Sequence, residues 1–431
     1  MVMSHQNQEG GQDMSHSDSN SVLSVVHQQC CGLDIHKDKI STTVILTHED
    51  GTIEEDIREF GTFTDDLFQL KEWLLSVGCH VVAMESTGVY WRPVHNVLED
   101  VCDIVLVNAR HVKHLPGKKT DVSDSRWLAS LLRHGLLKGS FIPEKHVREW
   151  RDLARLRKTY VENLADYKRR IHKLFECANI KIDSIASDLF GATGRNLMNL
   201  LVSGEEITQE AVAGCTRGRL KGKSDELYKS IQGFFSDHHR LQLVSILTII
   251  EVLEKQITKM HERLRSLLSD RRGKIDLLMV VPGVSEVSAY ALLSEIGDTL
   301  DQFKSSASLV AWAGLCPGNN ESAGKRHSGK SPVRNAPIKT IMTEVAWAAV
   351  KKGGSYYREK YYRLKARRGP KRAIVAVAHR ILKAVFHILK YGTPYRELGE
   401  AYLIQLTQKT RLQYLHKQAT QLGYMLMPVE A

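Results

Sequence analysis

The sequence predicts an α/β N-terminal domain, long coiled-coil helices and a mainly α-helical C-terminal domain. Three observations lead to this fold class. Residues 30–142 alternate short β-branched segments with segments of helical spacing. Two later stretches, 153–174 and 246–267, repeat apolar residues at alternating steps of three and four. Residues 341–400 have a helical pattern and are strongly basic.

The N-terminal domain is expected over residues 30–145. The preceding segment, 1–29, is rich in Ser, Gln, Asp, His and Gly, so we expect a disordered tail rather than a signal peptide. Alternation and turn residues then predict a mixed sheet with helices on its faces. The expected strands are 32–34, 40–47, 53–60, 80–85 and 103–107, and the expected helices are 63–77, 90–98 and 121–134.

The two heptad stretches predict coiled-coil helices within a linker domain over residues 146–272. Such helices can pair within one chain or between two chains, and the pattern does not choose between these arrangements. A separate, mainly helical C-terminal domain is then expected over 273–400, followed by a C-terminal tail over 401–431.

Composition limits the class of partner. The chain of 431 residues has a formal net charge of +11, which favours a polyanion such as nucleic acid. No apolar run is long enough to span a bilayer, so no membrane partner is expected. The seven cysteines are scattered without a Cys-x-x-Cys pair, which argues against a disulfide framework or a zinc site and suits a reduced cytoplasm.

Four acidic residues form a candidate metal site. Asp34 lies in an apolar strand, Glu85 ends another, and Asp121 and Asp124 are three residues apart at the start of a helix. Hard carboxylate oxygens suit Mg²⁺, and two such ions stabilise the attacking and leaving oxygens of a phosphoryl transfer. Each acid alone also fits an ordinary role, as a helix-starting acid or a solvated strand end. As a set of four on one α/β domain, they favour function.

Four segments together resemble the DEDD transposases of bacterial insertion sequences, a group related to pilin invertases. They are 32–37 (GLDIHK), 84–91 (MESTGVYW), 119–124 (KTDVSD) and 311–325 (AWAGLCPGNNESAGK). The resemblance implies a RuvC-like, RNase-H-type N-terminal domain with Asp34, Glu85, Asp121 and Asp124 as the metal ligands. It also implies a C-terminal transposase domain, donor and target DNA as substrates, and guidance by a structured bridge RNA.

Ser322 is the candidate nucleophile. It lies in a Gly-, Asn-, Ser- and Pro-rich basic loop over 314–339, where a positive field would attract a phosphodiester. Most loop serines are solvated turn residues, and Ser328 and Ser331 are close rivals by position. The resemblance implies that Ser322 forms a phosphoserine link to DNA, with serine and acids from different subunits of a tetramer, a dimer of dimers. The cations of this loop expected to bind nucleic acid are Lys325, Arg326, Lys330 and Arg334.

A second basic stretch, 351–372, contains ten Lys or Arg residues and one acid, with four tyrosines interleaved. Cations bind phosphates and aromatic rings stack on bases, so we expect contact with nucleic acid. The alternative is a solvated helix face whose tyrosines pack on the core. The cations assigned to binding are Lys365, Arg367, Arg368, Lys371 and Arg372.

The leading hypothesis is therefore an RNA-guided DNA recombinase that excises and inserts an insertion sequence through a serine–DNA intermediate. A RuvC-like structure-specific nuclease, in which the acids activate water, is the main alternative. A site-specific DNA invertase is a close variant, and a non-enzymatic nucleic-acid-binding protein is a further hypothesis. A covalent protein–DNA adduct distinguishes the recombinase from the nuclease.

Overall fold

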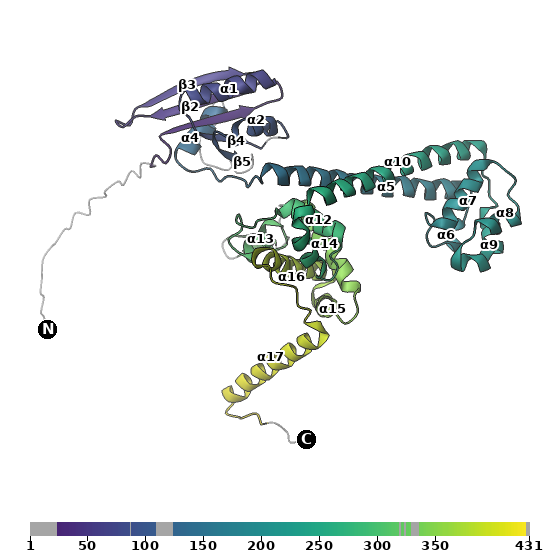
Figure 1. Ribbon diagram of the computed structural model, residues 1–431. Coiled ribbons are helices and arrows are strands. Elements are labelled where there is room, and N and C mark those ends of the chain that lie inside the picture. Colours follow the sequence, from purple (N-terminus) through teal and green to yellow (C-terminus); the bar gives the residue numbers. More distant parts are fainter. Residues whose placement is uncertain are drawn as a thin grey trace, which may run out of the picture. The chain divides into compact units, whose positions relative to one another are not determined.

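A computed structural model of the chain describes residues 24–86, 88–108, 124–318, 320–322, 325–328 and 336–427. The chain divides into two compact units, Met1–Ile142 and Pro143–Ala431 (Figure 1). The first unit contains a five-stranded sheet, and the second is mostly helical. The predicted combination of a mixed α/β domain and a mainly helical C-terminal region is confirmed.

The sheet of the first unit has the strand order β3-β2-β1-β4-β5. Its first three strands form an antiparallel meander, whereas β4 pairs parallel to both β1 and β5. Each expected strand is present, with β1 longer than the three residues predicted. The strands are β1 (Gln29–Ile35), β2 (Ile40–Thr47), β3 (Ile53–Phe60), β4 (Val81–Glu85) and β5 (Asp103–Val107).

Helices cover both faces of this sheet. Helices α1 (Thr64–Ser76) and α2 (Trp91–Leu98) pack on the face that includes Leu33 and Met84. Helix α4 (Asp124–Arg133) packs on the opposite face, which includes Cys30 and Ala83. Because side chains alternate along a strand, odd and even positions of β1 and β4 serve two separate cores.

Helix α4 lies directly against β1. A Cβ atom at Gly32 would lie 2.0 Å from the Ser125 carbonyl oxygen, so only glycine allows this approach. At the other end of α4, the Arg133 carbonyl accepts hydrogen bonds from the Val26 and His27 amides at 2.8 and 3.1 Å. Helix α4 therefore runs antiparallel to β1. The expected tail over 1–29 is accordingly too long at its end, since residues from Val26 onward bind α4.

Two long helices, α5 (Lys145–Cys177) and α10 (Asp237–Leu267), pair within the second unit. Leu174 shares a core with Leu243, whereas Trp150 shares another with Leu264, so the helices are antiparallel. The two heptad stretches therefore pair within the chain. That the two helices supercoil around each other remains a prediction. The elements between these helices are α6 (Ile182–Ile185), α7 (Ala192–Ser203), α8 (Gln209–Cys215), η1 (Gly218–Lys223) and α9 (Ser224–Ile231).

The rest of the second unit is a helical assembly built around one large core. Helix α16 is its centre, since Val377, Ile381 and Val385 are fully buried. The expected C-terminal tail contains a helix, α17. The elements are η2 (Ser269–Arg271), α11 (Arg272–Met279), α12 (Glu286–Ile296), α13 (Ser306–Trp312), α14 (Ala336–Lys351), α15 (Tyr356–Arg368), α16 (Pro370–Tyr391) and α17 (Gly399–Gln421).

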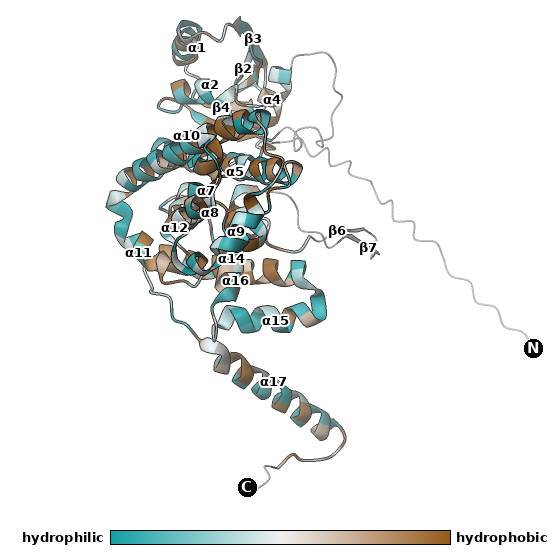
Figure 2. Cartoon of the chain, turned by 90° about the vertical axis from the view of Figure 1, so that its right-hand side faces the viewer, coloured by the Kyte–Doolittle hydropathy of each residue, from teal (hydrophilic) through white to brown (hydrophobic). Residues whose placement is uncertain are grey.

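Helix α17 differs from the others in its pattern. Apolar and polar residues alternate along it without forming one apolar stripe (Figure 2). Leu403 is buried, but Leu412 and Tyr414 are exposed. Within the described part of the chain, no helix is both long and apolar enough to span a bilayer.

Candidate functional site

Asp34 and Glu85 lie side by side at the carboxyl ends of β1 and β4, two neighbouring inner strands of the sheet. They are on the edge of the sheet that these strand ends form, not on an outer strand. Leu33 pairs with Met84 in the parallel register of β1 and β4, and the two acids are the next residues on these strands. Neighbouring strands are about 4.8 Å apart, which brings the two backbones close. Each acid is two residues beyond a position facing α4, Gly32 or Ala83, so both side chains face that same side.

Helix α4 begins at this edge. The Ser125 hydroxyl hydrogen-bonds with the Thr43 hydroxyl at 2.9 Å, and Thr43 is the register partner of Gly32. Asp124 immediately precedes Ser125, so it lies at the end of α4 near Asp34 rather than at the end near Val26. Among the described residues, no group of three or more His, Cys, Asp or Glu side chains is gathered tightly enough to hold a metal ion. Asp121 lies outside the described residues.

His36 is a neighbour of Asp34 that the pattern of acidic residues does not predict. Its Nε2 atom lies 3.1 Å from Asp34 Oδ2, and its side chain is 59% exposed. Asp34 itself is 23% exposed, so it is reachable from solvent. The signal available in the sequence is the spacing of two residues at the end of a strand, which puts both side chains on one side.

Ser322 lies in a two-stranded hairpin rather than in the irregular loop that the composition predicts. Strand β6 (Asn320–Ser322) pairs antiparallel with β7 (Lys325–Ser328). Ser322 is the register partner of Lys325, and Glu321 is the partner of Arg326. Lys330, Ser331 and Arg334 lie outside the described residues. The hairpin brings the backbone of one expected cation directly opposite the candidate serine.

The segment before this hairpin is anchored on α16. Leu315 is buried in the core of the second unit. Burial lowers the pKa of His379 on α16, while a hydrogen bond to the Leu315 backbone opposes that shift. His379 is partly buried, and its hydrogen bond with the Leu315 backbone ties the segment before the hairpin to α16.

The tyrosines of the basic stretch divide into two groups. Tyr357 and Tyr361 on α15 are buried at 3% and 4% exposure and belong to the core, so the stacking role expected for them is wrong. Tyr362 is 48% exposed, and its ring has Arg358 and Lys365 each 5.7 Å from the centroid. This exposed ring between two cations retains the geometry needed to stack on a base.

The cations assigned to this stretch point into solvent. Lys360 is partly buried, and burial together with nearby Arg380, Arg367 and Arg363 lowers its pKa. Such mutual repulsion marks a concentrated positive field, which an anionic backbone would relieve. The exposed cations are Lys365, Arg367, Arg368, Lys371 and Arg372.

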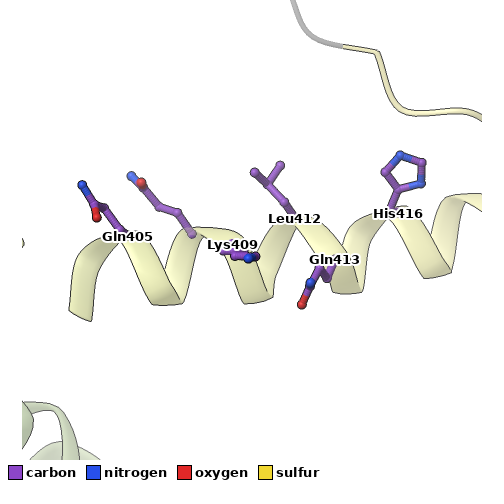
Figure 3. A pocket seen from close by; sticks show the side chains of 6 residues that line it. Gln405, Lys409, Leu412, Gln413 and His416 are labelled. Carbon is purple, nitrogen blue, oxygen red and sulfur yellow. The ribbon is translucent and has the colours of Figure 1, made fainter. Parts of the chain in front are cut away.

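The hollow along α17 and the cysteine thiols are weaker candidates for a functional site. A hollow along α17 is lined by Gln405, Lys409, Leu412, Gln413 and His416 of that one helix (Figure 3). The seven cysteines are free thiols, and burial raises the pKa of Cys30 to about 11 and of Cys79 to about 12. These two thiols therefore stay protonated at neutral pH and are poor nucleophiles.

Comparison with known families gives two matches. Residues 31–179 match a DEDD-type IS110 model described as "Transposase", and residues 275–363 match one described as "Transposase IS116/IS110/IS902 family". Together they cover more than half of the chain, in the order of its two units. No curated protein matches the sequence. The first match contains Asp34, Glu85 and Asp124, and the second contains Ser322. The chain is therefore a transposase of the IS110 type, an enzyme that acts on DNA.

Proposed function

We propose that this transposase is an RNA-guided serine recombinase that excises and inserts an insertion sequence through a covalent serine–DNA intermediate. The observation that supports it most is the meeting of Asp34 and Glu85 at the edge of the sheet where α4 begins. A meander followed by two parallel strands also suits an RNase-H-type, RuvC-like domain. The proposed domains are 30–145, 146–272 and 273–400.

The acids fit a divalent metal by their chemistry. Asp34, Glu85, Asp121 and Asp124 would offer hard carboxylate oxygens, the ligands that Mg²⁺ prefers. Asp34 is partly exposed, so an ion could reach it. When bound, Mg²⁺ would polarise the scissile phosphate and lower the pKa of an attacking hydroxyl. The role of His36 would be to hold the Asp34 carboxylate in place through their contact.

Ser322 would supply the nucleophile. Its Oγ would attack the phosphorus of a DNA strand, a phosphoserine bond would form, and one P–O ester bond would break. The leaving oxygen would take a proton to become a free DNA hydroxyl. Attack by another DNA hydroxyl would then reverse the step and release the serine. Because the ester energy is conserved, strands are rejoined without ATP.

Cations of the second unit would bind the nucleic acids. Next to Ser322, Lys325 and Arg326 would neutralise the phosphate as negative charge develops. The α15–α16 cations would hold the backbone of donor DNA, target DNA or bridge RNA in a salt-dependent way. A dimer of dimers would bring acids and serine together from different subunits. The cations of this proposal are Lys325, Arg326, Lys330, Arg334, Lys365, Arg367, Arg368, Lys371 and Arg372.

The decisive experiment is to trap the adduct. Wild-type protein, assembled with its RNA and donor DNA, should yield a denaturant-stable protein–DNA complex whose trapped nucleotide maps to Ser322 by mass spectrometry. Ser322→Ala should abolish the adduct, while the matched variant Ser328→Ala should retain it. Cleavage without any adduct would favour the nuclease hypothesis, and an adduct on Tyr362 would replace serine with tyrosine chemistry.

A further inference from the structure

The second unit contains a cavity of about 350 Å³ between α5, α10, α12 and α14. Apolar side chains form much of its wall, among them Ala154, Leu264 and Ile341. Polar and charged side chains line the rest of it. They are Arg155, Arg157, Lys158, Glu162, His261, Ser285, Ser288, Tyr290, Glu295 and Glu344. The volume of the cavity exceeds that of a nucleobase.

Arg157 is a cation without a partner. Its Nε atom is buried and has no hydrogen-bond partner, and no described carboxylate lies within ion-pair distance of the guanidinium. Arg155, on the same helix, instead forms a two-fold hydrogen bond with Glu295 at 2.8 and 2.9 Å. Burial accordingly lowers the pKa of Arg157. Arg157 is only partly buried, but its Nε atom is shielded from water without a partner, so its place in a cavity favours an anionic ligand.

His261 is a second unsatisfied group in the same cavity. Its Nδ1 atom is buried without a hydrogen-bond partner, and its ring centroid lies 5.6 Å from that of Tyr290. Glu162 is 64% exposed, so this acid lies toward solvent rather than facing Arg157 from inside. Two of the other lining cations are paired, Arg155 with Glu295 and Lys158 with Glu162. The cavity therefore combines apolar wall residues with two polar groups that lack partners, Arg157 Nε and His261 Nδ1.

We propose that this cavity binds a single unpaired nucleotide, with Arg157 on its phosphate and with the apolar wall and His261 on its base. The proposal rests on the proposed function for the source of that nucleotide, a DNA strand or the guide RNA. A base turned out of its stack offers both the apolar faces and the polar edge that this cavity accepts. The cavity would thereby fix the register of a strand in the second unit.

The test is calorimetric titration of the full chain with deoxynucleoside 5′-monophosphates, ribonucleoside 5′-monophosphates and inorganic phosphate. One nucleotide should bind per chain, more tightly than inorganic phosphate. Arg157→Gln should weaken binding about 10- to 100-fold, as expected for a hydrogen-bonded charge. Ala348→Phe, which fills the cavity, should abolish it. The preference between deoxy- and ribonucleotides identifies DNA or RNA as the source.

Lys173→Gln is the matched control, since it removes one exposed cation about 24 Å further along α5. It should bind nucleotides like the wild type. The melting temperature of Arg157→Gln should equal or exceed that of the wild type, because a partly buried cation whose Nε atom lacks a partner is removed. A purely structural arginine would give a lower value. Unchanged nucleotide affinity in Arg157→Gln, or equal affinity for inorganic phosphate, would overturn the proposal. The Ser322 adduct is measured separately, so either proposal can fail alone.

Discussion

At the scale of single residues, Asp34 and Glu85 are fixed in position because each directly follows a buried residue of its strand. Asp34 and Glu85 each follow a buried strand residue, Leu33 and Met84, that is inaccessible to solvent. Their backbones therefore cannot move apart without disrupting the core. Rigid placement of these acids would suit the proposed metal-dependent phosphoryl transfer, because the transition state of such a reaction is stabilised by geometry set in advance.

Removing one charge at this edge should stop catalysis and leave the fold intact. We expect Asp34→Asn, Glu85→Gln or Asp124→Asn to reduce strand cleavage by about 1000-fold or more, since several kcal/mol of transition-state stabilisation would be lost. Excess EDTA should have the same effect on the wild type. Asp38→Asn, a nearby exposed acid, is the control and should cleave normally. Undiminished cleavage in EDTA would contradict a metal site.

Gly32 should be intolerant of even a methyl group. A Cβ there would meet the Ser125 oxygen at 2.0 Å and the Ala129 nitrogen at 2.5 Å, both of them backbone atoms of α4. Gly32→Ala should therefore destabilise the protein by about 1–3 kcal/mol, measured by chemical denaturation. In Gly139→Ala the new methyl group would make an ordinary contact at 3.5 Å, so that midpoint should barely change. Equal midpoints in both variants would contradict the close packing of α4 on β1.

At the scale of elements, sequence periodicity predicts those that have one buried face. Helices α1, α2, α5 and α10 follow this rule, although α10 begins at Asp237, before the predicted stretch 246–267. The central strands β1 and β4 are buried on both faces and are predicted instead from their apolar composition. Periodicity does not predict the β6–β7 hairpin, because its strands are short and polar. Whether Asp34, Glu85 and Ser322 meet is also beyond the sequence, since it depends on packing between elements distant along the chain.

Helix α15 shows how charge can conceal a core pattern. Tyr357, Tyr361 and Leu364 are spaced four and three residues apart, as on one face of a helix, but cations surround them. The two tyrosines are buried and Leu364 packs against the same core. The one-sided charge favours nucleic-acid binding for the whole stretch, whereas the spacing assigns half of its tyrosines to the interior.

Substituting Tyr361 should therefore lower stability, whereas substituting its neighbour Tyr362 should weaken nucleic-acid binding. Tyr361→Ala should cost about 3–5 kcal/mol of stability, because it empties a buried aromatic site. Tyr362→Ala should leave the melting temperature nearly unchanged but weaken binding of single-stranded nucleic acid by about 1–3 kcal/mol, as expected when one base loses its stacking partner. Thermal melts and filter binding measure the two effects. Normal binding by Tyr362→Ala would place base stacking elsewhere.

At the scale of the whole molecule, the proposed catalytic groups are divided between two compact units. The acids belong to Met1–Ile142, whereas Ser322 belongs to Pro143–Ala431. Each unit has its own hydrophobic core, so damage to one site need not disturb the other. The first family match, residues 31–179, contains the described acids and extends into the second unit, whereas the second match, residues 275–363, contains the serine.

This division has a genetic consequence. A chain bearing Asp34→Asn keeps a sound serine, and a chain bearing Ser322→Ala keeps sound acids. If different subunits contribute the two groups, co-expression of these inactive alleles should restore a fraction of recombination that neither allele supports alone. A chain bearing both substitutions, co-expressed with either single variant, should remain inactive. Failure of the two alleles to rescue one another would mean that acids and serine act within one chain; success would sort point mutations of a single gene into two complementation groups.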